Sequence, residues 1–181
     1  MRFILVLVVA LLTAVAARAD QTDPRLAELF ADLQAAQEGE PATIIANQIW
    51  TIWIASDDTA AGELMAAGIA LMSLGRPIEA LARFDKLVEI APQFAEAWNK
   101  RATVHYLLDN YQQSVDDIER TLALEPRHFG ALSGLGLIYM ETGEDDIALR
   151  AFEGALKVNP HLPGARRNIE IINGRLKQKA I

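Results

Sequence analysis

The sequence repeats itself at a fixed interval, and this interval constrains the fold more than any other feature. The phrases EIAPQFAEA, ALEPRHFGA and KVNPHLPGA follow one another along the chain, and their central prolines, Pro92, Pro126 and Pro160, are equally spaced. A fixed period of this length indicates that one supersecondary unit is repeated. The chain therefore contains three consecutive blocks of equal length, residues 61–94, 95–128 and 129–162.

Each block carries the pattern of two helices. In the last block, apolar residues at helical spacing predict a first helix over about residues 130–142 and a second helix that ends before Pro160. Gly143 lies between them and can adopt the left-handed conformation that commonly ends a helix. Gly75 and Asp109 occupy the same position in the earlier blocks, so we expect the same turn in all three.

The packing within each predicted hairpin also repeats. A small residue recurs in the first helix and a bulky apolar residue recurs in the second, in the pairs Gly68 with Phe84, Ala102 with Ile118, and Gly136 with Phe152. The small residue allows the two helices to approach closely. Because one hairpin cannot bury two apolar stripes by itself, we expect the hairpins to stack on one another.

These residues resemble the tetratricopeptide repeat family, whose pattern places a large apolar residue, Leu-Gly, Tyr, Ala, Phe, Ala and Pro at set offsets within each repeat. The last block matches with Leu132, Leu135, Gly136, Tyr139, Ala148, Phe152, Ala155 and Pro160. The middle block keeps Trp98, Ala102, Ser114, Ile118 and Pro126, and the first keeps Leu64, Gly68, Leu71, Ala80, Phe84 and Pro92. The first block departs from the pattern at Leu87, where a small residue is usual. The resemblance implies an all-α fold, a right-handed superhelical solenoid of antiparallel helix pairs.

Two further segments flank the three repeats. Residues 20–60 are expected to form an N-terminal helical hairpin, because extending the register backwards gives 27–60 as a degenerate repeat in which Phe30, Ala46, Trp50 and Trp53 fall on packing positions. We expect this hairpin to form a lid on the start of the stack. Residues 163–181 begin like another first helix and become basic, which predicts a C-terminal capping helix with a polar outer face.

The segment 1–19 has the features of a secretory signal peptide. Arg2 precedes an uncharged apolar run over residues 3–16, and Ala17-Arg18-Ala19 gives a small-x-small cleavage pattern. As a helix the run would be about 21 Å long, shorter than a bilayer core of roughly 30 Å. We therefore expect a cleaved leader and an exported, periplasmic product without a stable membrane span. An uncleaved anchor is the alternative, because Arg18 is unusual so close to the cut.

The composition excludes several classes of function. The net charge is −7, and it becomes −9 when the leader and its two arginines are removed, which argues against a nucleic-acid binder. The absence of cysteine excludes disulfides, thiolate metal sites and a cysteine nucleophile. No glycine-rich phosphate loop is present. We expect no cofactor.

The family resemblance also implies a binding surface. In tetratricopeptide repeats, positions 2, 5, 9 and 12 of each first helix line a concave groove that holds peptide ligands. In this sequence the groove would contain Met65, Ile69, Met72, Glu96, Asn99, Thr103, Tyr106, Ser133, Leu137 and Met140, with Arg167 and Ile171 from the capping helix.

The chemistry of this lining narrows the kind of ligand. Some family members hold a C-terminal carboxylate with groove lysines and arginines, but position 5 here is Met65, Asn99 or Ser133. Methionines with other apolar side chains instead favour an extended or helical protein segment, whose backbone Asn99 could bind. The alternative is that the chain's own N-terminal hairpin, or self-association, covers these side chains.

The candidates for catalysis and metal binding are weak. His105 falls on a packing position, and Asp109, four residues later, could orient its ring, but no activated nucleophile is recognisable nearby. His128 and His161 lie in successive turns between repeats, without a third ligand, so we expect no metal site. Arg101 is expected to pair with Asp117 across one hairpin as a structural contact.

The sequence therefore predicts a non-enzymatic, exported scaffold or assembly factor that binds a protein or peptide in a concave groove. Two alternatives stay open. The chain could be the accessory subunit of a cell-envelope enzyme complex, or an enzyme with an unrecognised site that uses His105.

Overall fold

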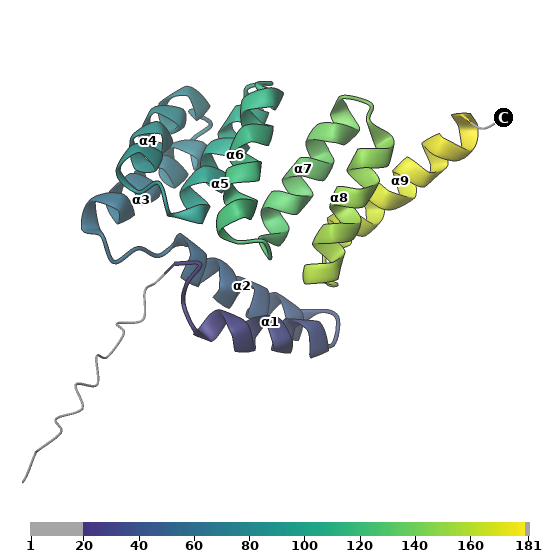
Figure 1. Ribbon diagram of the computed structural model, residues 1–181, viewed down its shortest axis with the longest axis horizontal. Coiled ribbons are helices and arrows are strands. Elements are labelled where there is room, and N and C mark those ends of the chain that lie inside the picture. The colour runs from purple at the N-terminus through teal and green to yellow at the C-terminus, as the bar shows by residue number, and fades with distance from the viewer. Residues whose placement is uncertain (1–19, 180–181) are drawn as a thin grey trace, which may run out of the picture.

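The computed structural model describes residues 20–179, which form helices and no strand (Figure 1). The helices are α1 (Arg25–Ala35), α2 (Glu40–Ile54), α3 (Thr59–Ser73), α4 (Pro77–Ile90), α5 (Ala95–Leu107), α6 (Tyr111–Leu124), α7 (Phe129–Glu141), α8 (Asp145–Val158) and α9 (Pro163–Lys179). The prediction of an all-α helical repeat solenoid is confirmed. The predicted leader, residues 1–19, lies outside the described residues.

Three helix pairs stack side by side along the molecule. These are α3 with α4, α5 with α6, and α7 with α8, and α9 packs on the last of them (Figure 1). The helices begin and end close to the predicted block boundaries. The exception is α3, which begins at Thr59 because Asp58 caps it, its carboxylate accepting the Ala61 N–H at 2.9 Å.

The turn inside each pair has the left-handed residue that the sequence predicts. The φ angle is 67° at Gly75, 58° at Asp109 and 82° at Gly143. The next residue in each turn donates its N–H to a carbonyl five residues earlier, as Asn110 does to His105 at 2.9 Å. This pattern satisfies carbonyl groups that the end of the helix would otherwise leave without a donor.

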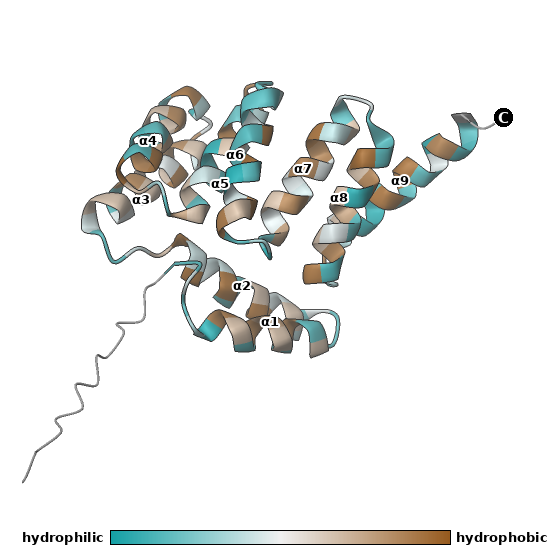
Figure 2. Cartoon of the chain, in the orientation of Figure 1, coloured by the Kyte–Doolittle hydropathy of each residue, from teal (hydrophilic) through white to brown (hydrophobic). Residues whose placement is uncertain are grey.

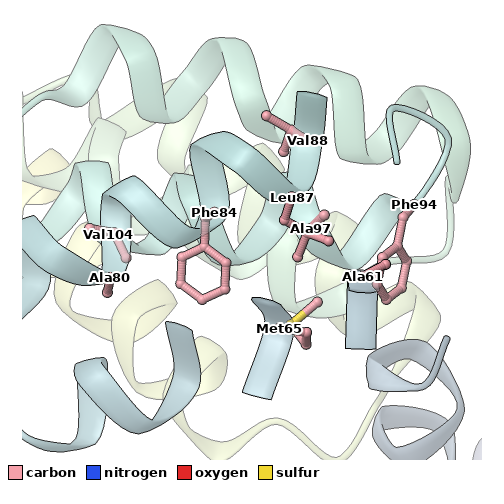
Figure 3. Packing of buried hydrophobic residues seen from close by; sticks show 9 residues of the cluster. All are labelled: Ala61, Met65, Ala80, Phe84, Leu87, Val88, Phe94, Ala97 and Val104. Atoms are coloured by element: carbon pink, nitrogen blue, oxygen red, sulfur yellow. The ribbon is translucent and has the colours of Figure 1, made fainter. Parts of the chain in front are cut away.

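The predicted close approach within a pair is also confirmed. A Cβ atom built on Gly68 would lie 2.5 Å from the ring of Phe84, and one on Gly136 would lie 2.7 Å from the ring of Phe152. Phe84 lies in a buried cluster that α3, α4 and α5 share, together with Met65 (Figure 3). Glycine is therefore required where the first helix crosses the phenylalanine of the second.

Neighbouring pairs pack through one recurring interface. The third and tenth residues of a block are buried against the second helix of the preceding pair, as Ala97 and Val104 are with Val88 of α4. Ala131 and Ile138 repeat this against α6, and Ala165 and Ile172 repeat it against α8. Figure 2 shows that α6 combines hydrophobic residues with many hydrophilic ones. In contrast, α7, which packs against both α6 and α8, has few hydrophilic residues.

The N-terminal hairpin α1–α2 does not lie where the repeat register places it. The sequence predicts a lid on the start of the stack, but the hairpin instead crosses the ends of α5, α7 and α8 (Figure 1). Leu26, Phe30, Ile49 and Trp53 form a separate core with Phe129 at the start of α7. The hairpin is helical as predicted, but its apolar face is buried against the turns between repeats.

Hydrogen bonds fix this placement near the end of α8. Gln34 of α1 donates to the carbonyls of Lys157 and Val158 at 2.8 and 2.5 Å. His161 Nε2 lies 3.1 Å from the Leu33 carbonyl oxygen. The hairpin therefore joins segments that are far apart in the sequence.

Candidate functional site

The predicted groove residues lie in different environments along the stack. Those that the rest of the chain buries are Met65, Glu96 and Asn99; those that are half-buried are Ile69, Met72, Tyr106, Ser133, Leu137 and Met140; and those that are exposed are Thr103, Arg167 and Ile171. The buried ones belong to the N-terminal halves of α3 and α5. The structure therefore closes the groove at the end nearest the N-terminal hairpin and leaves the rest accessible.

Met65 is part of the core rather than of an open surface. It is 1 % exposed and packs in the cluster of Ala61, Phe84 and Phe94 (Figure 3). Ile54, the last residue of α2, packs against the same cluster. This position cannot contact a ligand without rearrangement.

Glu96 is the centre of a buried polar cluster at the start of α5. His128 Nε2 lies 2.7 Å from Glu96 Oε2, and both side chains have no exposed surface. Because His128 Nδ1 accepts the Ala131 N–H at 3.0 Å, the ring proton is on Nε2 and is donated to the carboxylate. Lys100 Nζ pairs with Glu96 Oε1 at 3.0 Å, and Asn99 Nδ2 donates to Oε2 at 3.1 Å.

Two tryptophans of α2 cover this cluster. The Trp53 ring stacks on His128 with centroids 4.1 Å apart and an angle of 11° between the planes. Trp50 meets the His128 ring edge-on, and Lys100 Nζ lies 5.2 Å from the Trp50 centroid. Gly130 makes room for Trp50, because a Cβ atom there would lie 2.6 Å from the indole. The tryptophans of the N-terminal hairpin therefore pack against residues of the second and third repeats.

The charges of this cluster favour the ionised carboxylate. Burial by itself would raise the pKa of Glu96, but the hydrogen bond from His128 and the nearby charge of Lys100 outweigh burial and hold the pKa below 4.5. Glu96 was predicted to line the groove, and it is instead a buried structural group.

The sequence contains a signal for this cluster that the prediction did not use. At the last position of each block, Phe94 and Leu162 are apolar, whereas the middle block has His128. At the second position, Gly62 and Gly130 have no side chain, whereas the middle block has Glu96. A polar pair that replaces an apolar residue and a glycine in only one repeat indicates a contact outside the repeat pattern.

The accessible part of the groove contains a pocket between α5 and α7. Its volume is about 200 Å³, and its walls include Ala102, Tyr106, Ile118 and Leu137. Gly134 leaves this space open, because a Cβ atom there would already contact Ile118 at 3.5 Å. The pocket has the size of one apolar side chain.

The polar groups at the rim of the pocket are mainly acceptors. Thr103 Oγ1 donates to the Asn99 carbonyl at 2.9 Å, and Ser133 Oγ donates to the Phe129 carbonyl at 2.8 Å. Each hydroxyl therefore uses its proton within its own helix and keeps lone pairs for a ligand N–H. Burial, with smaller contributions from Glu141 and Asp109, raises the pKa of Tyr106, so its phenol stays protonated near neutral pH.

The remaining predicted side chains have structural partners. Arg101 pairs with Asp117 through bonds of 2.6 and 2.7 Å, as predicted, and also reaches Asp85 at 3.1 Å. His105 Nε2 lies 3.9 Å from Asp117 Oδ2. Asp109, the residue that could have oriented the His105 ring, instead accepts a hydrogen bond from the Tyr111 hydroxyl at 3.0 Å.

Within residues 20–179, the side chains and helices lack the features of a metal site and of a membrane span. No three His, Asp or Glu side chains of this part of the chain are placed to hold a metal ion. His128 and His161 have separate partners, Glu96 and Leu33. None of the helices described has the length and hydropathy that a bilayer span requires.

Stacked hairpins with a small residue against a phenylalanine, a left-handed turn and an accessible inner face define a helical repeat protein of the kind that binds other proteins. The family model described as "Tetratricopeptide repeat" matches residues 65–117 and 101–163. The chain belongs to the tetratricopeptide repeat family, whose members mediate protein–protein interactions.

Comparison with curated proteins supports this membership. A TPR repeat-containing protein of Rhizobium etli is 35% identical over 152 residues, which is 84% of this chain and 74% of that protein. The photosystem I assembly protein Ycf3 of Prochlorococcus marinus is 30% identical over 109 residues, covering 53% of this chain and 62% of Ycf3.

Solved structures show the same fold. A crystal structure of the MamA protein is 28% identical with a TM-score of 0.59, and covers 62% of this chain and 61% of that chain. The first TPR domain of Spaghetti (RPAP3), solved with an HSP90 peptide, has a TM-score of 0.64 at 21% identity, and covers 67% of this chain and 96% of that chain. The second likeness concerns the fold alone.

Proposed function

We propose that this protein is a non-enzymatic scaffold or assembly factor that binds a segment of a protein partner in the accessible part of its groove. The observation that carries the proposal is the pocket of about 200 Å³ between α5 and α7. It combines an apolar floor with acceptor groups at its rim, and this combination suits a peptide that inserts one side chain and donates backbone N–H groups.

The groove lining specifies the character of the partner segment. Ile69, Met72, Leu137 and Met140 are half-buried apolar side chains along the same inner surface. Methionines adapt their shape to a ligand at low cost. We therefore propose an apolar anchor residue such as leucine, methionine or phenylalanine, flanked by residues with few charges.

The N-terminal hairpin limits where such a segment can lie. Asn99 was expected to bind a ligand backbone, but its amide nitrogen already donates to Glu96. The partner segment should therefore run over α5, α7 and α9 beyond the buried cluster, and Arg167 and Ile171 are exposed there.

The named relatives have functions of this class. One is a photosystem I assembly protein, and another is the Hsp70-Hsp90 organizing protein of Triticum aestivum, 28% identical over 109 residues. These roles belong to those proteins. They support the proposal that this chain functions as an assembly factor or adaptor.

We further propose that the protein acts outside the cytoplasm, in a bacterial periplasm. The proposal rests on the sequence of residues 1–19. Mass measurement of the protein recovered from a periplasmic extract should give a chain that begins at Asp20. Recovery of the full-length chain from the cytoplasm would reject it.

Selection of peptides from a displayed library tests the groove. Peptides that bind the protein should share one apolar anchor, and Leu137→Glu should weaken their binding about tenfold or more because it places a charge in the pocket wall. Ala82→Glu is the matched control, since Ala82 is exposed on α4. Unchanged binding to Leu137→Glu would reject the groove assignment.

A further inference from the structure

One face of α3, the first helix of the stack, corresponds to the face that packs in the later repeats, but no helix of the described chain covers it. The interface between repeats uses the third, seventh and tenth residues of a block, and in two cases also the fourteenth, Leu108 and Leu176. On α5, α7 and α9 this face is covered by α4, α6 and α8 in turn. The same four positions of the first block are Glu63, Ala67 and Ala70 of α3 and Leu74, the residue that follows this helix.

Of these residues Glu63, Ala70 and Leu74 are exposed and Ala67 is half-buried, whereas their equivalents in the later blocks are buried or half-buried, except for the exposed Thr142. Ala70 is exposed and Leu74 is 69% exposed, whereas Val104 and Ile138, which are equivalent to Ala70, are 0% and 2% exposed. Ile78, at the start of α4, is 73% exposed at the same end of the stack. The face is apolar over most of its length and carries one carboxylate, Glu63, near its N-terminal end.

The sequence of α2 explains why this helix does not cover α3. Each covering helix contributes two branched apolar residues seven positions apart: Leu81 and Val88 on α4, Val115 and Leu122 on α6, Leu149 and Leu156 on α8. The equivalent residues of α2 are Asn47 and Ile54. Asn47 is exposed, because burial on α3 would remove its amide from water without a partner.

The three interfaces between repeats show how a covering helix is oriented on this face. In each of them the covering helix runs antiparallel to the covered one, because only a short turn connects them, such as residues 91–94 between α4 and α5. The second apolar residue of the pair therefore lies near the start of the covered helix. A helix docked on α3 in this way would place its C-terminal turn beside Glu63.

We propose that the α3 face binds an amphipathic helix of another protein, antiparallel to α3. Two leucine or valine residues seven positions apart pack against Ala67 and Ala70, and the small size of the alanines leaves room for leucine. A lysine or arginine in the last turn faces Glu63, where it also suits the C-terminal end of the helix dipole. This surface is separate from the groove.

The charges and exposed residues favour a different protein over a second copy. No helix in residues 20–179 exposes a pair of large apolar residues seven positions apart; the exposed ones are Ile44, Leu74, Ile78, Ile90, Leu107 and Ile171. The capping helix α9 carries Arg166, Arg167 and Glu170 on its exposed surface. The described chain therefore lacks the helix that its own first repeat would accept.

A peptide with the sequence of α8 provides a defined probe. The peptide DDIALRAFEGALKV, acetylated and amidated, has Leu149 and Leu156 seven positions apart and Lys157 in its last turn. Titrated into the full ¹⁵N-labelled chain, it should cause saturable amide shifts at Ala67, Ala70 and Leu74. Half-saturation is expected below about 1 mM, since a free helix of this length is only marginally formed.

Matched variants separate the α3 face from other sites. Ala70→Arg should raise the dissociation constant about tenfold or more, whereas Ala82→Arg, the same change at an exposed alanine of α4, should leave it unchanged. A peptide with Leu149→Gln and Leu156→Gln should not bind. Leu137→Glu, which tests the groove, should not affect this binding.

Four results would overturn the proposal. The first three are the absence of saturable shifts on α3, equal binding of the glutamine peptide, and binding that Ala70→Arg does not weaken. A concentration-dependent dimer of the wild-type chain that Ala70→Arg abolishes would also overturn it, since a second copy would then occupy the face.

Discussion

At the scale of single residues, Glu96 and His128 form an acid–imidazole pair in which neither side chain has exposed surface. An ionised carboxylate without exposed surface is stable only when its hydrogen bonds and charges are satisfied. Here His128, Lys100 and Asn99 supply them, and Trp53 excludes water from one face of the imidazole. The pair is therefore sensitive to the loss of either partner.

Removing one partner of the pair should lower the free energy of unfolding more than removing both. His128→Ala leaves the Glu96 carboxylate buried with too few donors, and we expect it to lower the free energy of unfolding by about 3 kcal/mol. His128→Leu combined with Glu96→Ala replaces the pair with residues close to those of the other repeats, and it should cost less. Urea unfolding measures both. A double variant that is less stable than His128→Ala would contradict this account.

The same pair should give the protein a defined acid sensitivity. The pKa of Glu96 is lower in the folded state than its ordinary value of 4.5, so its contribution to stability is complete above that value and is lost as the pH falls through the folded pKa. We expect the stability difference between wild type and Glu96→Gln to shrink as the pH falls below about 4.5. Thermal unfolding at a series of pH values above and below this point tests it, and a constant difference would exclude Glu96 as the cause.

At the scale of helices, the contact between Gly136 and Phe152 determines how closely α7 and α8 pack. We expect Gly136→Ala to destabilise the protein by about 1–3 kcal/mol, because its Cβ would overlap the ring. Gly154→Ala is the control. Its Cβ would lie 3.7 Å from Leu132, so the helix propensity of alanine should stabilise α8 by up to about 1 kcal/mol. Melting temperatures that move in the same direction for both variants would contradict this interpretation.

Helix pairing follows from local sequence, but the position of the N-terminal hairpin does not. Trp50 and Trp53 fit the register of a fourth repeat as well as they fit the site that they occupy. At a position where α4, α6 and α8 have leucine or valine, α2 has the polar residue Asn47, which disfavours packing of α2 on α3. The importance of this position for the placement of α2 becomes clear only when the interfaces between repeats are compared.

At the scale of the whole molecule, the hairpin α1–α2 connects repeats that a simple solenoid would couple only through their neighbours. Trp53→Ala should release it, because the indole is 1% exposed and stacks on His128. We expect a loss of about 3–5 kcal/mol in the stability of the hairpin's docking. Amide exchange should then rise in α1 and α2 while α7 and α8 stay protected. Equal rises in all four helices would show that the hairpin and the stack unfold as one unit.

The accessibility of the proposed groove was only partly predictable. Of the residues that the family resemblance places in the groove, Ile69, Met72, Tyr106, Leu137 and Met140 stay half-buried. Met65, Glu96 and Asn99 are instead buried, because α2 and its connection to α3 cover that end of the groove. A pattern that recurs at a fixed interval describes contacts within and between repeats, and it contains no information about a segment that packs outside the period.

The sequence alone determined the helix pairs, their turns and their stacking, because these depend on residues that are close together or that recur at a fixed interval. Only the tertiary structure decided which surfaces remain available. Docking of the N-terminal hairpin joins residues 26–54 to residues 128–162, and such long-range packing depends on the shapes of both surfaces at once. The same docking closes one end of the groove and leaves the face of α3 without a cover.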